Sequence, residues 1–334
     1  MTRTPTPGSL AQIARVVACA VVCGTSLMAG TALAQAYPTK PIQLVIPFPP
    51  GGATDVIGRL VGKKLSEKLG QSVVIDNRPG AGTIVGAGFA AKAAPDGYTL
   101  FLSSGTTFTV NPAIHAKLPY DPVKSFEPIG LTGRTGLILL ANKDVPVHDL
   151  KQLVAAAKAA PGKYTYGTFG AGTTAQFAGE MLFNLAGIKL LHVPYKGSAP
   201  AMTDLIGGQI PYTIDTVAAA VPQVRAGKVK AIAVTTAKRS QLLPNVPTVA
   251  EAGFPGIDAD TWLALVAPRG LPADVKQKLE AALAASMADA DMRKQLLDAG
   301  FEPSYADGAA VSALISRELP LMRATAQRAN ITAE

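Results

Sequence analysis

Two turns rich in glycine and threonine are the parts of this sequence best suited to chemistry. The first, residues 49–54 (PPGGAT), follows an apolar run, and the second, residues 170–174 (GAGTT), follows another. Each stands where a strand would end and a helix would begin. Each would therefore present unpaired backbone N–H groups and hydroxyls at a helix N-terminus, which is an arrangement that binds anions. Plain strand-to-helix connections without a ligand have the same local pattern.

The strand ends are otherwise poor in groups that perform reactions. No Gly-x-Ser-x-Gly motif occurs, and the three histidines, His115, His148 and His192, are far apart in the sequence. Residues 80–86 (GAGTIVG) resemble a dinucleotide fingerprint, but they do not follow directly on a strand and no acidic residue ends the next strand. The sequence therefore predicts a site that binds through N–H groups and hydroxyls, without catalysis, cofactor or metal. An exported hydrolase or oxidoreductase using the same site is the alternative.

The first 36 residues have the pattern of a cleavable signal peptide. Arg3 and Arg15 supply positive charge, residues 16–33 are small and apolar, and residues 32–34 and 34–36 are small-x-small triplets that would allow cleavage. A single membrane anchor is the alternative for this stretch. Both cysteines lie within it, so the mature chain would have no disulfide and no cysteine metal site.

Length and charge limit the function further. The chain has 334 residues, which is enough for two domains with cores of their own. Its formal net charge is +8. The basic residues are scattered, without a stripe or interleaved aromatic residues, so no nucleic acid partner is expected.

Strands and helices are predicted to alternate after the signal, in the order of an α/β protein. Strands are expected at 43–48, 72–76, 98–103, 164–169, 189–194, 212–215 and 230–235. Helices are expected at 54–69, 83–93, 149–160, 173–185, 199–206, 217–225, 273–287, 290–299 and 308–328. The order of the first three strands and their helices implies a parallel sheet with right-handed crossovers.

Two further runs are expected to connect the halves of the chain. Residues 129–141 could form one long strand that leaves a first domain and enters a second, and residues 262–266 could form a strand that returns. The fold predicted from this pattern is two doubly wound α/β domains with a hinge and a central cleft. Domain 1 would be discontinuous, comprising residues 37–135 and 259–334, and domain 2 would comprise residues 136–258.

Five motifs stand in order along the mature chain. They are residues 47–55 (PFPPGGATD), 77–82 (NRPGAG), 95–100 (PDGYTL), 192–197 (HVPYKG) and 204–209 (DLIGGQ). Together they closely resemble the substrate-binding receptors of tripartite tricarboxylate transporters, also called the Bug family. The resemblance covers essentially all of the chain after the signal.

The resemblance implies a periplasmic solute receptor with a Venus-flytrap fold, expected to be a monomer. Its ligand would be a small organic carboxylate, and its partners would be the integral-membrane permease subunits. A sensor that presents the ligand to a membrane signalling protein is a further alternative. One wall of the site would comprise Phe48, Pro50, Gly51, Gly52, Thr54, Asp55, Ser103, Ser104 and Thr106. The other would comprise Gly170, Gly172, Thr173, Thr174, Lys196, Gly197 and Pro200, with Asp215 at its back.

Several of these residues also have simpler interpretations. The glycines could serve backbone geometry alone, Thr54 and Thr174 could be helix caps, and Lys196 could be merely exposed. Asp215 would repel a carboxylate, so it would orient neighbouring groups or receive an amine. A bulky residue at Gly52 or at Gly172 is expected to abolish binding and to leave the fold intact.

Two stretches depart from the family pattern. Gln176 stands near the position where the family commonly has a histidine, and residues 103–107 (SSGTT) are unusual. Both departures fall where ligand choice would be made, so the resemblance does not identify the ligand.

Overall fold

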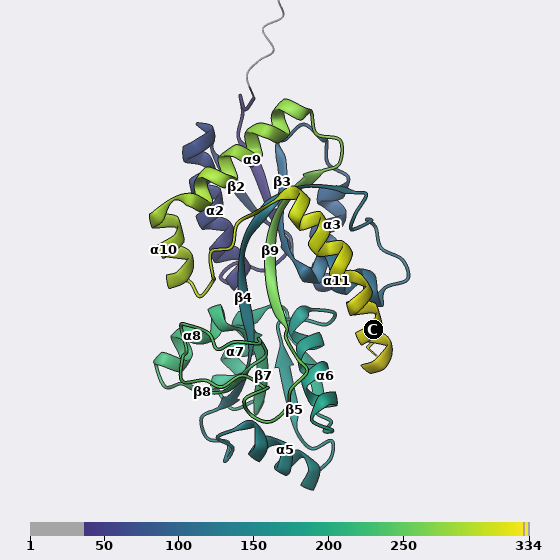
Figure 1. The fold of residues 1–334 in the computed structure, drawn as a ribbon, viewed down its shortest axis with the longest axis vertical. Coiled ribbons are helices and arrows are strands. Elements are labelled where there is room, and N and C mark those ends of the chain that lie inside the picture. The colour runs from purple at the N-terminus through teal and green to yellow at the C-terminus, as the bar shows by residue number, and fades with distance from the viewer. Residues whose placement is uncertain (1–36, 330, 333–334) are drawn as a thin grey trace, which may run out of the picture. The chain divides into compact units, whose positions relative to one another are not determined.

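The computed structural model describes residues 37–329, 331 and 332, and its contacts group Lys40–Glu334 into one compact unit. All elements named below belong to that unit (Figure 1). The signal peptide expected over residues 1–36 lies outside the described residues. In the described part of the chain, no helix has the length and apolar character needed to cross a membrane.

Three parallel strands begin the sheet. β1 (Ile42–Ile46) lies between β2 (Val73–Asn77) and β3 (Thr99–Ser104) and is paired in parallel with both. Ile42, Leu44, Val45 and Ile46 are fully buried, as expected for an inner strand covered on both faces. The helical elements that follow these strands are α2 (Ala53–Leu69), η1 (Ala81–Thr83), α3 (Ile84–Ala91), η2 (Thr106–Val110) and α4 (Asn111–Ile114).

Two long strands run through the middle of the unit (Figure 1). β4 (Phe126–Asn142) and β9 (Asp260–Pro268) are antiparallel to each other, and β9 is antiparallel to β3. The predicted long strand and return strand are thus confirmed. The parallel sheet predicted for the first three strands is confirmed by β1, β2 and β3. β9 is antiparallel to its neighbours because it returns beside β4 without the crossover helix that parallel pairing requires.

The partner of β4 changes along its length. Up to Gly136 it pairs with β9, and from Leu137 onward it pairs with β7 (Tyr212–Thr216) and β8 (Val229–Val234). We refer to β1, β2, β3, β9, the short β10 (Ala306–Asp307) and the beginning of β4 as the first section of the sheet, and to the rest as the second section. One ten-stranded sheet therefore extends through both sections.

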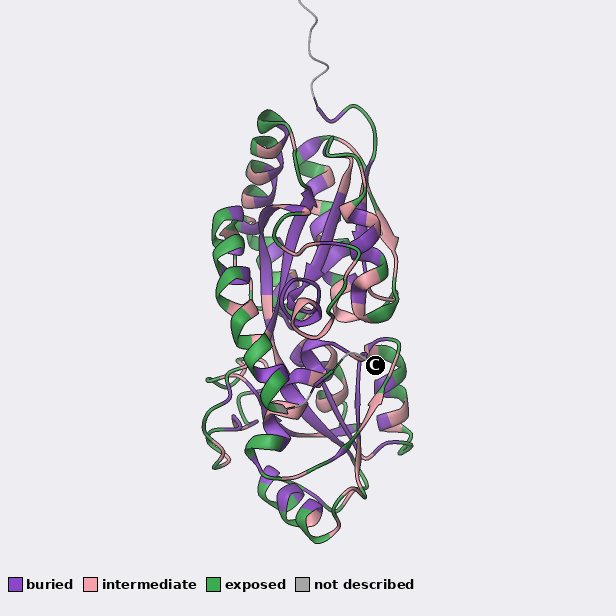
Figure 2. Ribbon diagram, turned by 90° about the vertical axis from the view of Figure 1, so that its right-hand side faces the viewer, coloured by how far each residue is buried: buried purple, intermediate pink, exposed green. Residues whose placement is uncertain are grey.

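The second section repeats the strand–turn–helix pattern of the first. β5 (Thr165–Thr168) is paired in parallel with both β6 (Leu191–Pro194) and β7. The helices of this section are α5 (Leu150–Ala159), α6 (Thr174–Leu185), α7 (Ser198–Ile206) and α8 (Val217–Arg225). Its main core packs the buried faces of α5 and α6 against β4, β5 and β7. Figure 2 shows the strands buried in both sections and the outer faces of the helices exposed.

The C-terminal elements return to the first section. They are α9 (Ala273–Ala288), α10 (Ala290–Asp298), the short β10 (Ala306–Asp307) and α11 (Gly308–Ala329). The end of α11 also reaches the second section, because Ala326 and Ile331 pack with Val110 of η2 and Phe177 of α6 in one buried cluster. The sequence pattern did not predict η2, α4 or β10, which are short and have no periodicity long enough to be recognised.

Candidate functional site

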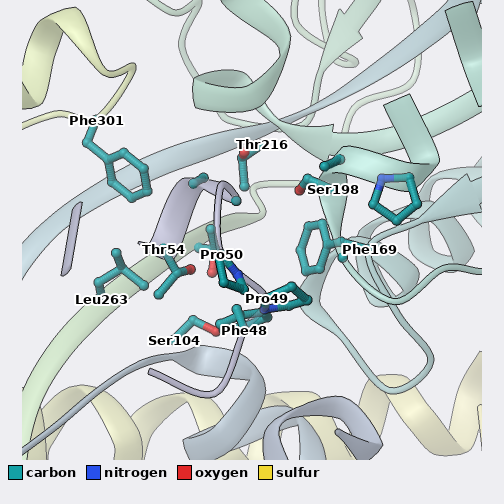
Figure 3. A pocket seen from close by; sticks show the side chains of 16 residues that line it. Phe48, Pro49, Pro50, Thr54, Ser104, Phe169, Ser198, Thr216, Leu263 and Phe301 are labelled. Carbon is teal, nitrogen blue, oxygen red and sulfur yellow. The ribbon is translucent and has the colours of Figure 1, made fainter. Parts of the chain in front are cut away.

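A pocket with an empty volume of about 530 Å³ lies between the two sections of the sheet (Figure 3). We call it the central pocket. The first section contributes Phe48, Pro49, Pro50, Gly52, Ala53, Thr54, Ser104, Thr261, Leu263 and Phe301. The second section contributes Phe169, Gly197, Ser198, Ala199, Pro200 and Thr216. Strand ends and helix starts from both sections therefore meet at one place, as expected at the carboxyl ends of α/β strands.

The turn between β1 and α2 forms one wall of the pocket. Gly52 is the N-cap residue of α2, and no side chain caps the helix there. The sequence-based suggestion that Thr54 caps this helix is wrong, because Thr54 lies inside its first turn. The first backbone N–H groups of a helix have no acceptor within it, so this end of α2 offers donors and the positive end of its dipole to the pocket.

Asp55 holds this turn in place. Its carboxylate accepts hydrogen bonds from the Gly51 N–H at 2.9 Å, the Asn77 amide at 2.9 Å and Arg59 at 3.0 Å. Burial favours the neutral form of this carboxyl, but these hydrogen bonds and the charge of Arg59 outweigh it, so the pKa of Asp55 is lowered. Asp55 does not line the central pocket, and it acts by fixing the shape of the turn.

Two buried hydroxyls of the first section complete this wall. Thr261 lines the pocket, and its hydroxyl oxygen, which is itself buried, has no hydrogen-bond partner among the described residues. The Ser104 hydroxyl accepts from the Thr106 N–H at 3.3 Å, which leaves its own proton free to be donated. A buried polar group without a partner costs free energy, so an acceptor in the pocket would be stabilised here.

The opposite wall is organised by Asp215, which is fully buried behind the pocket. One of its oxygens, Oδ1, accepts from the Ser198 hydroxyl at 2.8 Å, the Thr216 N–H at 2.7 Å and the Thr216 hydroxyl at 3.4 Å. The other, Oδ2, has no partner among the described residues. Burial raises the pKa of Asp215 to about 6 against the effect of these hydrogen bonds. Asp215 therefore orients the wall, as one of the two sequence-based interpretations stated.

The raised pKa of Asp215 predicts a pH-dependent stability. In the folded chain this carboxyl keeps its proton up to about pH 6, whereas in the unfolded chain it loses the proton near 3.8. Its contribution is fully present below the unfolded value and is lost as the pH rises through 6, by about 3 kcal/mol. The variant Asp215→Asn lacks this titration, so its free energy of unfolding relative to that of the wild type should rise by about 3 kcal/mol between pH 4 and pH 7. Urea titrations at each pH measure both free energies. The exposed Asp144→Asn is the control, and an Asp215→Asn difference that stays constant with pH would contradict the prediction.

A larger cavity adjoins the central pocket, with an empty volume of about 1540 Å³. The two share Phe48, Pro49, Phe169 and Gly197. The rings of Phe48 and Phe169 meet edge to face with centroids 6.4 Å apart, and they form a partition between the cavities. The larger cavity is otherwise lined by residues 79–83, 114–115, 170–173 and 194–196, with Pro47, Gln176 and Thr332.

The second glycine turn lines this larger cavity rather than the central pocket. Gly172 is in the left-handed region (φ 61°), and a Cβ there would lie 3.0 Å from the Ile114 side chain. Its N–H donates to the Gln176 side chain at 2.7 Å, so Gln176 helps to hold the turn. A bulky residue at Gly172 would strain the backbone, so we expect it to lower stability by about 1–3 kcal/mol, unlike a substitution at Gly52.

Thr106 and Thr174 join the two sections directly. The Thr174 N–H donates to the Thr106 hydroxyl at 3.2 Å in a buried contact. Thr173, not Thr174, is the N-cap residue of α6, so the capping role suggested for Thr174 is also wrong. Neither threonine lines either cavity.

The structure thus divides the predicted site residues into three groups. The central pocket holds Phe48, Pro50, Gly52, Thr54, Ser104, Gly197 and Pro200. The larger cavity holds Gly170, Gly172, Thr173 and Lys196. Gly51, Asp55, Ser103, Thr106, Thr174 and Asp215 line neither.

The sequence-based prediction missed Phe169, Ser198, Thr216, Thr261, Leu263 and Phe301, which all line the central pocket. Ser198 and Thr216 could have been found, because each directly follows a predicted turn or strand end. Thr261, Leu263 and Phe301 come from the return strand and the C-terminal region, where no local pattern points to a ligand.

Three solved structures are similar to this chain. Rpa4515 of R. palustris with adipate is 34% identical, with a TM-score of 0.86 over 89% of this chain and 99% of that one. The periplasmic binding protein BugD is 34% identical, with a TM-score of 0.85 over 89% and 100%. MatC from Rhodopseudomonas palustris with bound malate is 32% identical, with a TM-score of 0.81 over 86% and 99%.

A family model described as the tripartite tricarboxylate transporter family receptor matches residues 57–331. This match spans most of the chain and both sections of the sheet, and it confirms the resemblance seen in the sequence motifs. The family consists of solute-binding receptors and not of enzymes, and the similar structure BugD is a periplasmic binding protein. The chain belongs to the tripartite tricarboxylate transporter receptor family.

Proposed function

We propose that this protein binds a small organic carboxylate in the central pocket and delivers it to an integral-membrane transporter from the periplasm. Membership of the receptor family supports the transport role. The bound adipate and malate of two similar structures support a carboxylate as the ligand. Export of this chain by its N-terminal segment is part of the same proposal.

The observation that carries the proposal is the set of unused donors among the residues that line the central pocket. The N-terminus of α2 opens into the pocket without a side-chain cap, and Thr261, which also lines it, has a buried hydroxyl with no partner among the described residues. Ser104 adds a further hydroxyl proton. A carboxylate oxygen can accept several such hydrogen bonds, and bonds to a charged acceptor are the stronger ones.

We further propose that the two sections act as domains that close on the ligand. Residues 37–135 with 259–334 would move against residues 136–258. The change of pairing partner on β4, between Gly136 and Leu137, supports hinge positions in β4 and just before β9. Since the walls of the central pocket come from both sections, a ligand that touches both walls would favour the closed form.

Isothermal titration calorimetry of the purified chain tests the proposal. A panel of carboxylates should include at least one that binds with a dissociation constant in the range of about 10⁻⁸ to 10⁻⁵ M. The matching primary amides, which keep the shape and lose the charge, should bind at least about 100-fold more weakly. Binding of the amides as tightly as the acids would contradict the proposal.

A further inference from the structure

We infer that Val110, Phe177, Ala326 and Ile331 form a latch that favours the closed arrangement of the two sections. These four residues are called the latch cluster below. The inference rests on the proposed function, because it takes up the closing motion proposed there. It goes further by naming residues outside the ligand site that set the balance between the open and the closed form.

The first reason is the place of the cluster relative to β4 and β9, where the hinges are proposed. Val110 ends η2, which follows β3, and β3 pairs with β9 on the side away from β4. Phe177 lies in α6, which follows β5, and β7 separates β5 from β4. The cluster therefore joins elements that lie to the side of β4 and β9 in each section. A rotation about the hinges would change the separation of such elements.

The second reason is the connection made by the C-terminal helix. α11 contacts β4 and β10 of the first section, and Ala326 near its end packs with Phe177 of α6 (Figure 1). The Ile331 N–H donates to the Ala326 carbonyl at 2.9 Å, which ties Ile331 to the last turn of α11. A segment anchored in the first section thus supplies two apolar side chains to a contact with the second.

The third reason is that this contact is costly to open. Phe177 is 2% exposed and Ile331 is 7% exposed, and separation of the sections would bring both into water. The same two elements, η2 and α6, are also joined by the hydrogen bond from the Thr174 N–H to the Thr106 hydroxyl at 3.2 Å. This N–H belongs to the first turn of α6 and has no acceptor within the helix, so opening would remove its partner. Both losses favour the closed form.

The latch cluster lies outside both cavities. None of its four residues lines the central pocket or the larger cavity, so it acts on affinity only through the equilibrium between the two forms. Where the closed form holds the ligand, the apparent dissociation constant varies inversely with the closed fraction of the protein. Weakening the latch should therefore weaken the binding of every ligand by the same factor.

The variant Ile331→Ala tests the inference, with malate and adipate as the probes. It shortens a side chain of the latch cluster, and calorimetry should show each probe that binds the wild type losing about 3–10-fold in affinity, by factors that agree within about twofold. Leu321→Ala is the matched control, because Leu321 lies on the same helix and is 57% exposed. This control should bind as the wild type does. An affinity of Ile331→Ala within twofold of the control, or a loss confined to one of two binding acids, would overturn the inference.

Small-angle X-ray scattering separates a shifted equilibrium from a damaged fold. Ligand-free Ile331→Ala should have a larger radius of gyration than Leu321→Ala, and a saturating acid should bring the two to the same value. Equal radii without ligand, or a difference that persists at saturation, would overturn the inference. Ile331→Val should give an intermediate result, and it replaces the alanine variant if that variant does not fold. If no carboxylate binds to the folded wild type, the proposed function fails, and the scattering of the ligand-free proteins still decides the inference.

Discussion

Replacing Gly52 with leucine is expected to abolish carboxylate binding and to leave the fold intact. Gly52 has φ −77° and ψ 166°, which any L-residue adopts without strain. A Cβ at this position would have a single near neighbour, the Pro49 carbonyl oxygen at 3.7 Å. The leucine side chain would occupy the central pocket and cover the N-terminus of α2, where we place the carboxylate.

The loss should be at least about 100-fold in affinity, because the added side chain takes the volume that the ligand needs. Calorimetry with the tightest acid of the panel measures it, and thermal unfolding followed by circular dichroism should show a melting temperature within about 3 °C of the wild type. Val56→Leu adds leucine to the same helix at an exposed position and should bind normally. Binding by Gly52→Leu within threefold of the wild type would rule out the central pocket as the ligand site.

The order of the elements was predictable because it depends on local patterns. Apolar runs bounded by glycine and proline predicted the strands, and the helix α8 was predicted with its observed ends, Val217 and Arg225. The direction of β9 was not predictable in the same way. Whether a returning strand runs parallel or antiparallel depends on its neighbours in space, and sequence periodicity carries no information about them.

The same limit applies to the site. Phe48, Gly52 and Thr54 were predicted because they belong to one continuous turn that also lines the central pocket. The second glycine turn looks equivalent in sequence, but Gly172 lines the adjoining cavity, where Gln176 holds its N–H. Thr261 and Phe301 are brought to the pocket by tertiary packing alone. Local sequence thus identified one wall, and only the fold identified the residues that complete it.

Replacing Trp262 with alanine should cause a large loss of stability. Trp262 is 1% exposed, stacks on Phe108 with ring centroids 5.8 Å apart, and donates its indole N–H to Glu318 of α11 at 2.8 Å. Alanine would leave a cavity in the core between β9 and α11, and truncation of a buried aromatic residue typically costs about 3–5 kcal/mol. Urea unfolding followed by circular dichroism measures the loss, since Trp262 is the only tryptophan of the chain. A loss below about 1 kcal/mol would contradict this account of the core.

The hydrogen bond to Glu318 can be separated from the packing. Trp262→Phe keeps most of the ring and removes the donor, so it leaves a carboxylate that is already partly desolvated without its partner. We expect this variant to lose about 1–3 kcal/mol, and the added change Glu318→Gln to recover part of that loss because it removes the buried charge. If the double variant is no more stable than Trp262→Phe, the indole serves the core by packing alone.

Because alternate residues of a strand face opposite sides, Thr261 and Leu263 face the pocket while Trp262 faces α11. Carboxylate affinity in the folded fraction of Trp262→Phe should therefore stay within about threefold of the wild type, which separates the stability of this strand from its part in the site.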